Sequence, residues 1–122
     1  MLSDLNLLMP NNQVVALNFA NTLNEAKQFE LAETVLQDFL LVHDQNFIAY
    51  DLLTQVYQKQ NKMSMMHATK AEVYALLGAY PRAVDELQTA YNFADDRPLI
   101  KKRIKARIIQ LQEQEDKLKR LN

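Results

Sequence analysis

Side chains that could bind a metal or act as nucleophiles are few, and their spacing fits no catalytic motif. The chain has no cysteine and two histidines, His43 and His67, neither of which lies in an H-E-x-x-H arrangement. A single glycine, Gly78, excludes a glycine-rich phosphate loop. Nearby carboxylates such as Glu30 and Glu33 fit a solvated helix face better than an acid–base pair. We therefore expect no catalytic residue, metal or cofactor in this chain, and we interpret His67 as a hydrogen-bonded structural residue.

The composition indicates a single α-helical domain. Of the 122 residues, 48% are hydrophobic and 24% are charged, and with 1 glycine and 3 prolines there are too few turn residues for an all-β fold. No apolar stretch approaches the ~20 residues that span a bilayer, and the start lacks the basic region of a signal peptide. The net charge is −1, but residues 1–60 carry 2 basic and 7 acidic groups (−5), whereas residues 61–122 carry 12 and 8 (+4).

Capping residues and helix breakers divide the chain into six helices. The run Asp44-Gln45-Asn46 supplies N-cap chemistry for the third helix, and Ser64 is a candidate N-cap for the fourth. Gly78 is an expected C-terminal stop, and Pro81 and Pro98 open helices. The helices are expected at about 13–26, 29–42, 47–60, 64–77, 81–94 and 98–120.

Apolar spacing predicts the face that each helix buries. The first helix should turn its apolar residues inward, namely Ala16, Phe19, Ala20 and Leu23. The last helix should pack one apolar stripe on the preceding helix, namely Ile100, Ile104, Ile108, Leu111 and Leu118.

The apolar pattern of these helices repeats with a period of 34 residues. When the sequence is shifted by 34 positions, Phe19 aligns with Leu53 and Leu23 aligns with Tyr57. Residues 78–83 fit the turn pattern Gly-x-aromatic-x-x-Ala, and residues 27–32 fit it without the glycine. This period and this turn are typical of tetratricopeptide (TPR) repeats. The predicted fold is all-α, a TPR-like superhelical solenoid of about six antiparallel helices with a long C-terminal capping helix. Turns near 27, 61 and 78 leave the pairing of the fourth helix open.

The predicted binding surface is the concave face, which the first helix of each pair lines. It lacks the several Lys and Arg residues that a carboxylate clamp requires, and its amides suit an extended protein segment. Asparagine is a poor helix former, so three asparagines in the first helix require a structural or a binding role to explain them. Asn21 and Asn24 are expected to face the groove, and inter-helix bonding is an equal alternative for Asn18. The candidate residues are Asn18, Asn21, Asn24, Asp51, Gln55 and Gln58.

A cluster of cations and a cluster of methionines are two further features that could contact a partner. Six cations fall within residues 97–107, with a candidate contact face of Lys101, Lys102 and Lys105. Because no aromatic residue interleaves with them, we interpret them as the outer face of a capping helix rather than a nucleic-acid site. Met63, Met65 and Met66 gather at a turn, either as core filling or as an adaptable patch for a partner.

The segment from His67 to Leu87, with Gly78 and Ala83, resembles the last TPR unit of the β-barrel assembly-enhancing protease family, bacterial periplasmic zinc metallopeptidases. The run Lys102–Leu111 is similar to that family's C-terminal helix, and Leu17–Leu23 matches its Leu-Asn-x-Ala-Asn pattern. The resemblance covers nearly the whole chain.

The resemblance implies an excised TPR domain, about a quarter of a parent protein whose zinc lies in a protease domain absent here. It further implies a periplasmic location and a role in outer-membrane protein assembly and quality control. The implied partners are proteins or peptides, including the barrel-assembly machinery and the parent's own protease domain. A generic TPR adaptor is the alternative, and a nucleic-acid or membrane-surface binder through residues 97–107 is a third.

Overall fold

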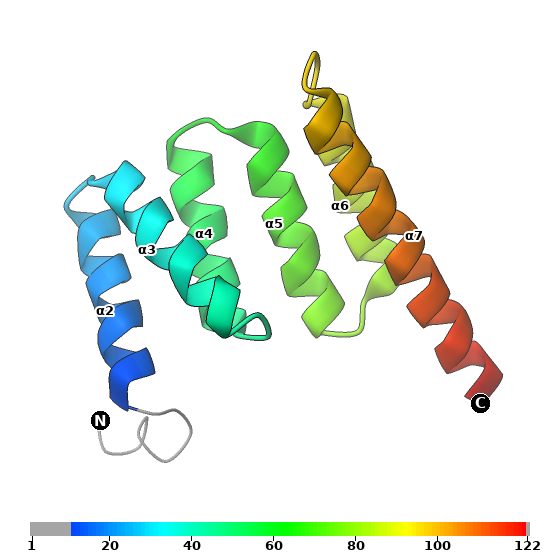
Figure 1. Cartoon of the computed structure of the whole chain (residues 1–122), viewed down its shortest axis with the longest axis horizontal. Coiled ribbons are helices and arrows are strands. Elements are labelled where there is room, and N and C mark those ends of the chain that lie inside the picture. Colours follow the sequence, from blue (N-terminus) through cyan, green and yellow to red (C-terminus); the bar gives the residue numbers. More distant parts are fainter. Residues whose placement is uncertain (1–10, 122) are drawn as a thin grey trace. The chain divides into compact units, whose positions relative to one another are not determined.

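A computed structural model describes residues 11–121, and it confirms the predicted all-α, TPR-like array with a long last helix (Figure 1). Consecutive helices pack side by side within each part of the array. Their bounds are α2 Asn11–Glu25, α3 Phe29–Val42, α4 Phe47–Lys59, α5 Met63–Leu76, α6 Tyr80–Asn92 and α7 Pro98–Leu121.

The described part of the chain divides into two compact units. The first unit ends at Gln60 and contains α2, α3 and α4; the second begins at Asn61 and contains α5, α6 and α7. Within the second unit α5 and α6 form an antiparallel pair around the turn at Gly78, so α5 serves as the first helix of that pair.

Two helix ends follow the capping chemistry expected from the sequence, the start of α4 and the end of α5. The Asn46 side chain accepts a 2.9 Å hydrogen bond from the Ala49 N–H at the start of α4. Gly78 has φ of 77° and follows α5, where the N–H groups of residues 78 and 79 close a Schellman motif. The same motif ends α2, but there Lys27 adopts φ of 63°. A lysine thus occupies a conformation that glycine adopts at less cost.

The face that α2 buries is rotated by about one residue from the predicted face. Phe19 is 54% exposed, whereas Leu17 is 5% exposed. The buried residues of α2 are Val14, Leu17, Ala20 and Asn24. The repeat misleads here because Leu53, the equivalent of Phe19, is buried in α4, which packs on both α2 and α3.

In the second unit, α6 lies between α5 and α7 and shares its core with both. Ala83, Leu87 and Ala90 of α6 are buried. Ile104 and Leu111 of α7 are buried with them, but Leu118 is 47% exposed because α7 continues past the core.

Ser64 is not the N-cap that the sequence suggested. Lys62 holds that position, and Ser64 is buried inside α5, where its hydroxyl donates a 2.8 Å hydrogen bond to the Ala90 carbonyl of α6. The side chain therefore joins two helices instead of ending one.

The first prediction concerns the small residues between these helices. Ala83→Leu should destabilise the protein by about 1–3 kcal/mol, because Ala83 is 0% exposed and a larger side chain overpacks the core. Gln88→Leu, on the exposed side of α6, is the control and should change stability little. Equal unfolding midpoints for both variants in urea would show that Ala83 is not a close-packing position.

The second prediction concerns Lys27 and Gly78, two of the residues with positive φ that follow helices. Lys27→Gly should stabilise the chain, because glycine removes the steric cost of positive φ. Gly78→Ala should destabilise it by about 1 kcal/mol, although no atom lies within 4 Å of the added Cβ. The two melting temperatures should move in opposite directions; shifts of the same sign would contradict this account.

Candidate interaction groove

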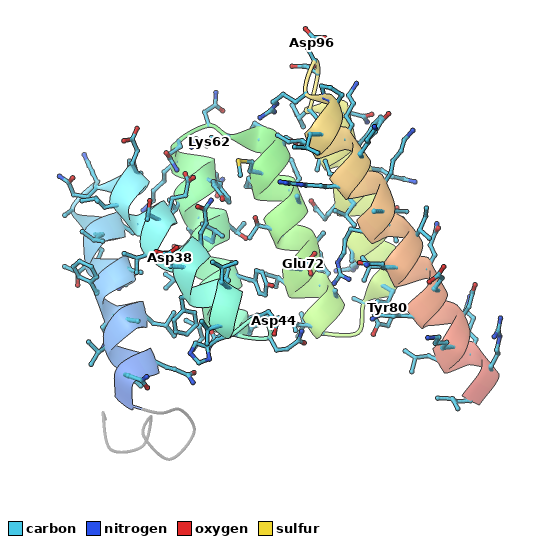
Figure 2. The ribbon with its side chains drawn as sticks, viewed as in Figure 1. Asp38, Asp44, Lys62, Glu72, Tyr80 and Asp96 are labelled. Atoms are coloured by element: carbon cyan, nitrogen blue, oxygen red, sulfur yellow. The ribbon has the colours of Figure 1, made fainter. Side chains whose placement is uncertain are left out.

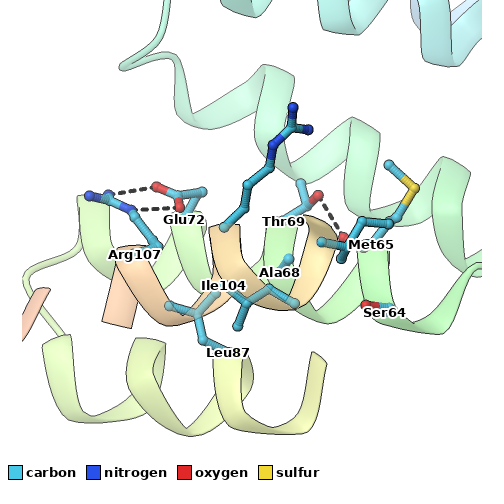
Figure 3. Close-up of a pocket in the computed structure, with 10 residues that line it drawn as sticks. Ser64, Met65, Ala68, Thr69, Glu72, Leu87, Ile104 and Arg107 are labelled. Atoms are coloured by element: carbon cyan, nitrogen blue, oxygen red, sulfur yellow. Dashed lines mark hydrogen bonds and ion pairs between the residues drawn. The ribbon is translucent and has the colours of Figure 1, made fainter. Parts of the chain in front are cut away.

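A groove runs between α5 and α7 above α6 (Figure 3). Its volume is about 220 Å³, and Leu87 of α6 and Ile104 of α7 contribute apolar surface to it. Met65, one of the clustered methionines, also lines it. The lining residues are Ser64, Met65, Ala68, Thr69, Glu72, Leu87, Ile100, Arg103, Ile104 and Arg107. No sequence pattern predicted this groove.

An ion pair between α5 and α7 closes one end of the groove. The Arg107 guanidinium donates to both carboxylate oxygens of Glu72, at 2.9 and 2.7 Å. Such a bidentate pair fixes both side chains geometrically. Both side chains are less than one-third exposed, so solvent screens the pair only in part. In Figure 3 this pair lies at one end and Met65 lies towards the other.

The polar side chains of the groove differ in whether they have partners. Thr69 donates a 2.7 Å hydrogen bond to the Met65 carbonyl, and Ser64 donates to Ala90. Arg103 is exposed, and within residues 11–121 it forms no hydrogen bond or ion pair. Arg103 therefore supplies the uncompensated positive charge of the groove.

Five of the six predicted groove residues lie on the surface of the first unit. Asn21 donates to Glu25 and Gln55 donates to Asp51, each at 3.3 Å, so these contacts stay within one helix. The exposed members are Asn18, Asn21, Asp51, Gln55 and Gln58. That they bind a partner stays a prediction.

Asn24 was expected to face the groove, and that expectation is wrong. The side chain is 3% exposed, and its Oδ1 accepts a 3.3 Å hydrogen bond from the Lys59 ammonium of α4. The same ammonium lies 5.8 Å from the centre of the Phe29 ring of α3. Lys59 thus contacts both neighbours of α4, and Asn24 has a structural role.

Two further polar contacts in the first unit join α3 to α4 and to the residue that follows it. Gln37 donates a 2.7 Å hydrogen bond to the Tyr57 hydroxyl, and Gln60 donates a 2.9 Å hydrogen bond to Glu33. Burial raises the pKa of Tyr57 above its ordinary value of 10.0; the Gln37 hydrogen bond opposes the shift, and the nearby Glu33 carboxylate adds to it.

The cationic cluster of residues 97–107 has several separate roles. Arg97 donates to the carbonyls of Phe93 and Ala94 and so caps the end of α6, near Asp96 at the tip of the turn (Figure 2). Arg107 pairs with Glu72 in the groove. Only part of the cluster remains for an external partner.

The candidate contact face contains an aromatic ring that its own segment lacks. The ammonium groups of Lys101 and Lys105 each lie 5.2 Å from the centre of the Tyr91 ring, which α6 supplies. Lys101 and Lys105 are four residues apart and share one face of α7, whereas Lys102 is exposed on a different face. Cation–π contact with one shared ring therefore accounts for two of the three lysines.

His67 has the structural surroundings that were expected. Its Nδ1 lies 2.7 Å from a Glu86 carboxylate oxygen, and its ring stacks on Phe93. In the described part of the chain, no group of three or more His, Cys, Asp or Glu side chains could hold a metal ion. None of the helices between residues 11 and 121 combines the length and the apolar character needed to cross a membrane.

Comparison with known proteins relates this chain to one class of bacterial protease. It is 30% identical over 108 residues to the β-barrel assembly-enhancing proteases of Escherichia coli K12, Shigella flexneri and Escherichia coli O157:H7. The match covers 88% of this chain but 22% of each of those proteins. No protein-family model matches the chain. The chain is thus a distant relative of one region of these proteases.

The third prediction separates a structural asparagine from an exposed one on the same helix. Asn24→Ala should lower stability by about 1 kcal/mol, because it removes a buried hydrogen-bond acceptor from Lys59. Asn21→Ala, its control one turn away, should leave stability unchanged or raise it slightly through helix propensity. If urea unfolding shows the larger loss for Asn21→Ala, the assignment of the two roles is wrong.

Proposed function

We propose that this chain is a non-catalytic, protein-binding TPR module of a periplasmic metalloprotease that acts in the assembly and quality control of outer-membrane proteins. The observation that carries the proposal is the 30% identity over 88% of the chain to proteases whose name refers to β-barrel assembly. The helical array and its apolar groove support a binding role, because concave sites of this kind hold a partner segment with few polar groups.

The α5–α7 groove is the proposed contact site. It combines an apolar floor, an adaptable methionine and one unpaired guanidinium on packed helices. The partner is a protein or peptide, with the barrel-assembly machinery and a protease domain of the same polypeptide as candidates. A TPR adaptor unrelated to proteolysis is the alternative, which a gene product lacking an H-E-x-x-H segment would favour.

The fourth prediction uses the complete gene product that contains this sequence, purified with a tag from its own cells. Barrel-assembly components should co-purify with it. Ala68→Trp fills the groove and should reduce their recovery several-fold, because Ala68 lines that surface. Ala106→Trp places the same side chain on an exposed position of α7 and should leave recovery unchanged.

Melting curves of the two variants identify any loss that comes from unfolding. Absence of every barrel-assembly component from the wild-type preparation would contradict the proposed function. Equal recovery with both folded variants would contradict the groove as the contact site.

A further inference from the structure

We propose that the α5–α7 groove binds a peptide segment that carries an apolar side chain beside a carboxylate, and that Arg103 binds the carboxylate. This inference rests on the proposed function and specifies the chemistry of its partner. It follows from the size of the groove, from its balance of charges and from the position of Arg103 on α7.

The size of the groove fits one side chain rather than a small-molecule ligand. Its volume of about 220 Å³ lies below the roughly 300–1,000 Å³ of typical small-molecule sites. Ala68 contributes no bulk on the α5 side, and Ile100 and Ile104 provide apolar surface on the α7 side. A leucine-sized side chain would remove this surface from water, which is the favourable term in binding.

The charges of the groove favour an anion over a cation. Three charged residues line it: Glu72, Arg107 and Arg103. Glu72 is engaged by Arg107 in the two short hydrogen bonds, so its carboxylate offers little to an incoming cation. Arg103 has no such partner in the described part of the chain, and a guanidinium matches a carboxylate in a bidentate geometry.

The position of Arg103 sets the spacing of the ligand's two groups. Arg103 precedes Ile104 and lies one helical turn before Arg107, so it stands beside the apolar floor. Alternate side chains of an extended segment point to the same face, about 7 Å apart. An apolar residue and an acidic residue two positions apart would therefore reach the floor and the guanidinium together.

The fifth prediction is tested with the isotope-labelled 122-residue chain and a blocked peptide, Gly-Ser-Leu-Thr-Asp-Ser-Gly. In nuclear magnetic resonance titrations, this peptide should saturate shifts of groove amides such as those of Thr69 and Ile104. Replacing its Asp by Asn should weaken binding about two- to fivefold, the effect of an exposed ion pair. Replacing its Leu by Ala should abolish saturable binding.

Variants of the chain test the role of Arg103 directly. Arg103→Glu should reverse the preference, so that a peptide with Lys in place of Asp binds more tightly than the Asp peptide. Lys102→Glu is the matched control, because it makes the same charge change one residue away, outside the groove lining. The control should retain the preference for Asp, and added salt should reduce that preference in the wild-type chain.

Three results with the peptides would overturn the inference: no saturable shift in the groove with the Asp peptide, equal binding of the Asp and Asn peptides, or the same preference in Arg103→Glu as in the wild type. If Lys102→Glu loses the preference for the Asp peptide as fully as Arg103→Glu does, overall charge causes the effect and the role of Arg103 is contradicted. If the complete Arg103→Glu protein still captures barrel-assembly components, the proposed function stands and this inference fails.

Discussion

The packing of α6 between α5 and α7 is the constraint on which the second unit depends. Ala83 and Ala90 of α6 and Ala71 of α5 are fully buried, so the helix backbones approach closely at small residues. Ser64 reinforces this contact by donating to the Ala90 carbonyl. Because α5 and α7 both pack on α6, the space above α6 between them becomes a groove whose width depends on those contacts.

The ion pair of Glu72 with Arg107 connects this packing to binding. It spans the groove between α5 and α7 and neutralises two of the three charges that line it. The pairing leaves Arg103 as the charge available to a ligand, so the same interaction limits the groove at one end and determines its electrostatic preference. A change at Glu72 would therefore alter both the geometry of the groove and its balance of charges.

Local sequence signals predicted the helices and most of the second core, because they act within a few residues. Asn46 caps α4, Gly78 ends α5, and Ala83 and Leu87 face inward, as capping and spacing rules require. The buried face of α2 was wrong because helical spacing alone does not separate Leu17 from Phe19 when both could join an apolar stripe. Packing against α3 and α4 decides between them.

The candidate site was harder to predict, since its parts come from distant positions. Glu72 and Arg107 are 35 residues apart, and Tyr91 meets Lys101 and Lys105 only after α6 and α7 have packed. Asn24 fits the sequence pattern of a groove residue, but Lys59, 35 residues further along the chain, donates a hydrogen bond to it. The methionine cluster, the cationic run and the apolar stripe of the last helix each supply residues to the groove, but sequence spacing did not indicate that they meet.

Site-specific photo-crosslinking in living cells tests most directly whether the α5–α7 groove is the contact surface. A photoreactive amino acid would replace Met65, which lines the groove, or Leu99, which is 60% exposed on α7 and does not line it. The account predicts adducts with an outer-membrane assembly protein or a protease domain from position 65 and none from position 99. Adducts from position 99 alone would contradict it.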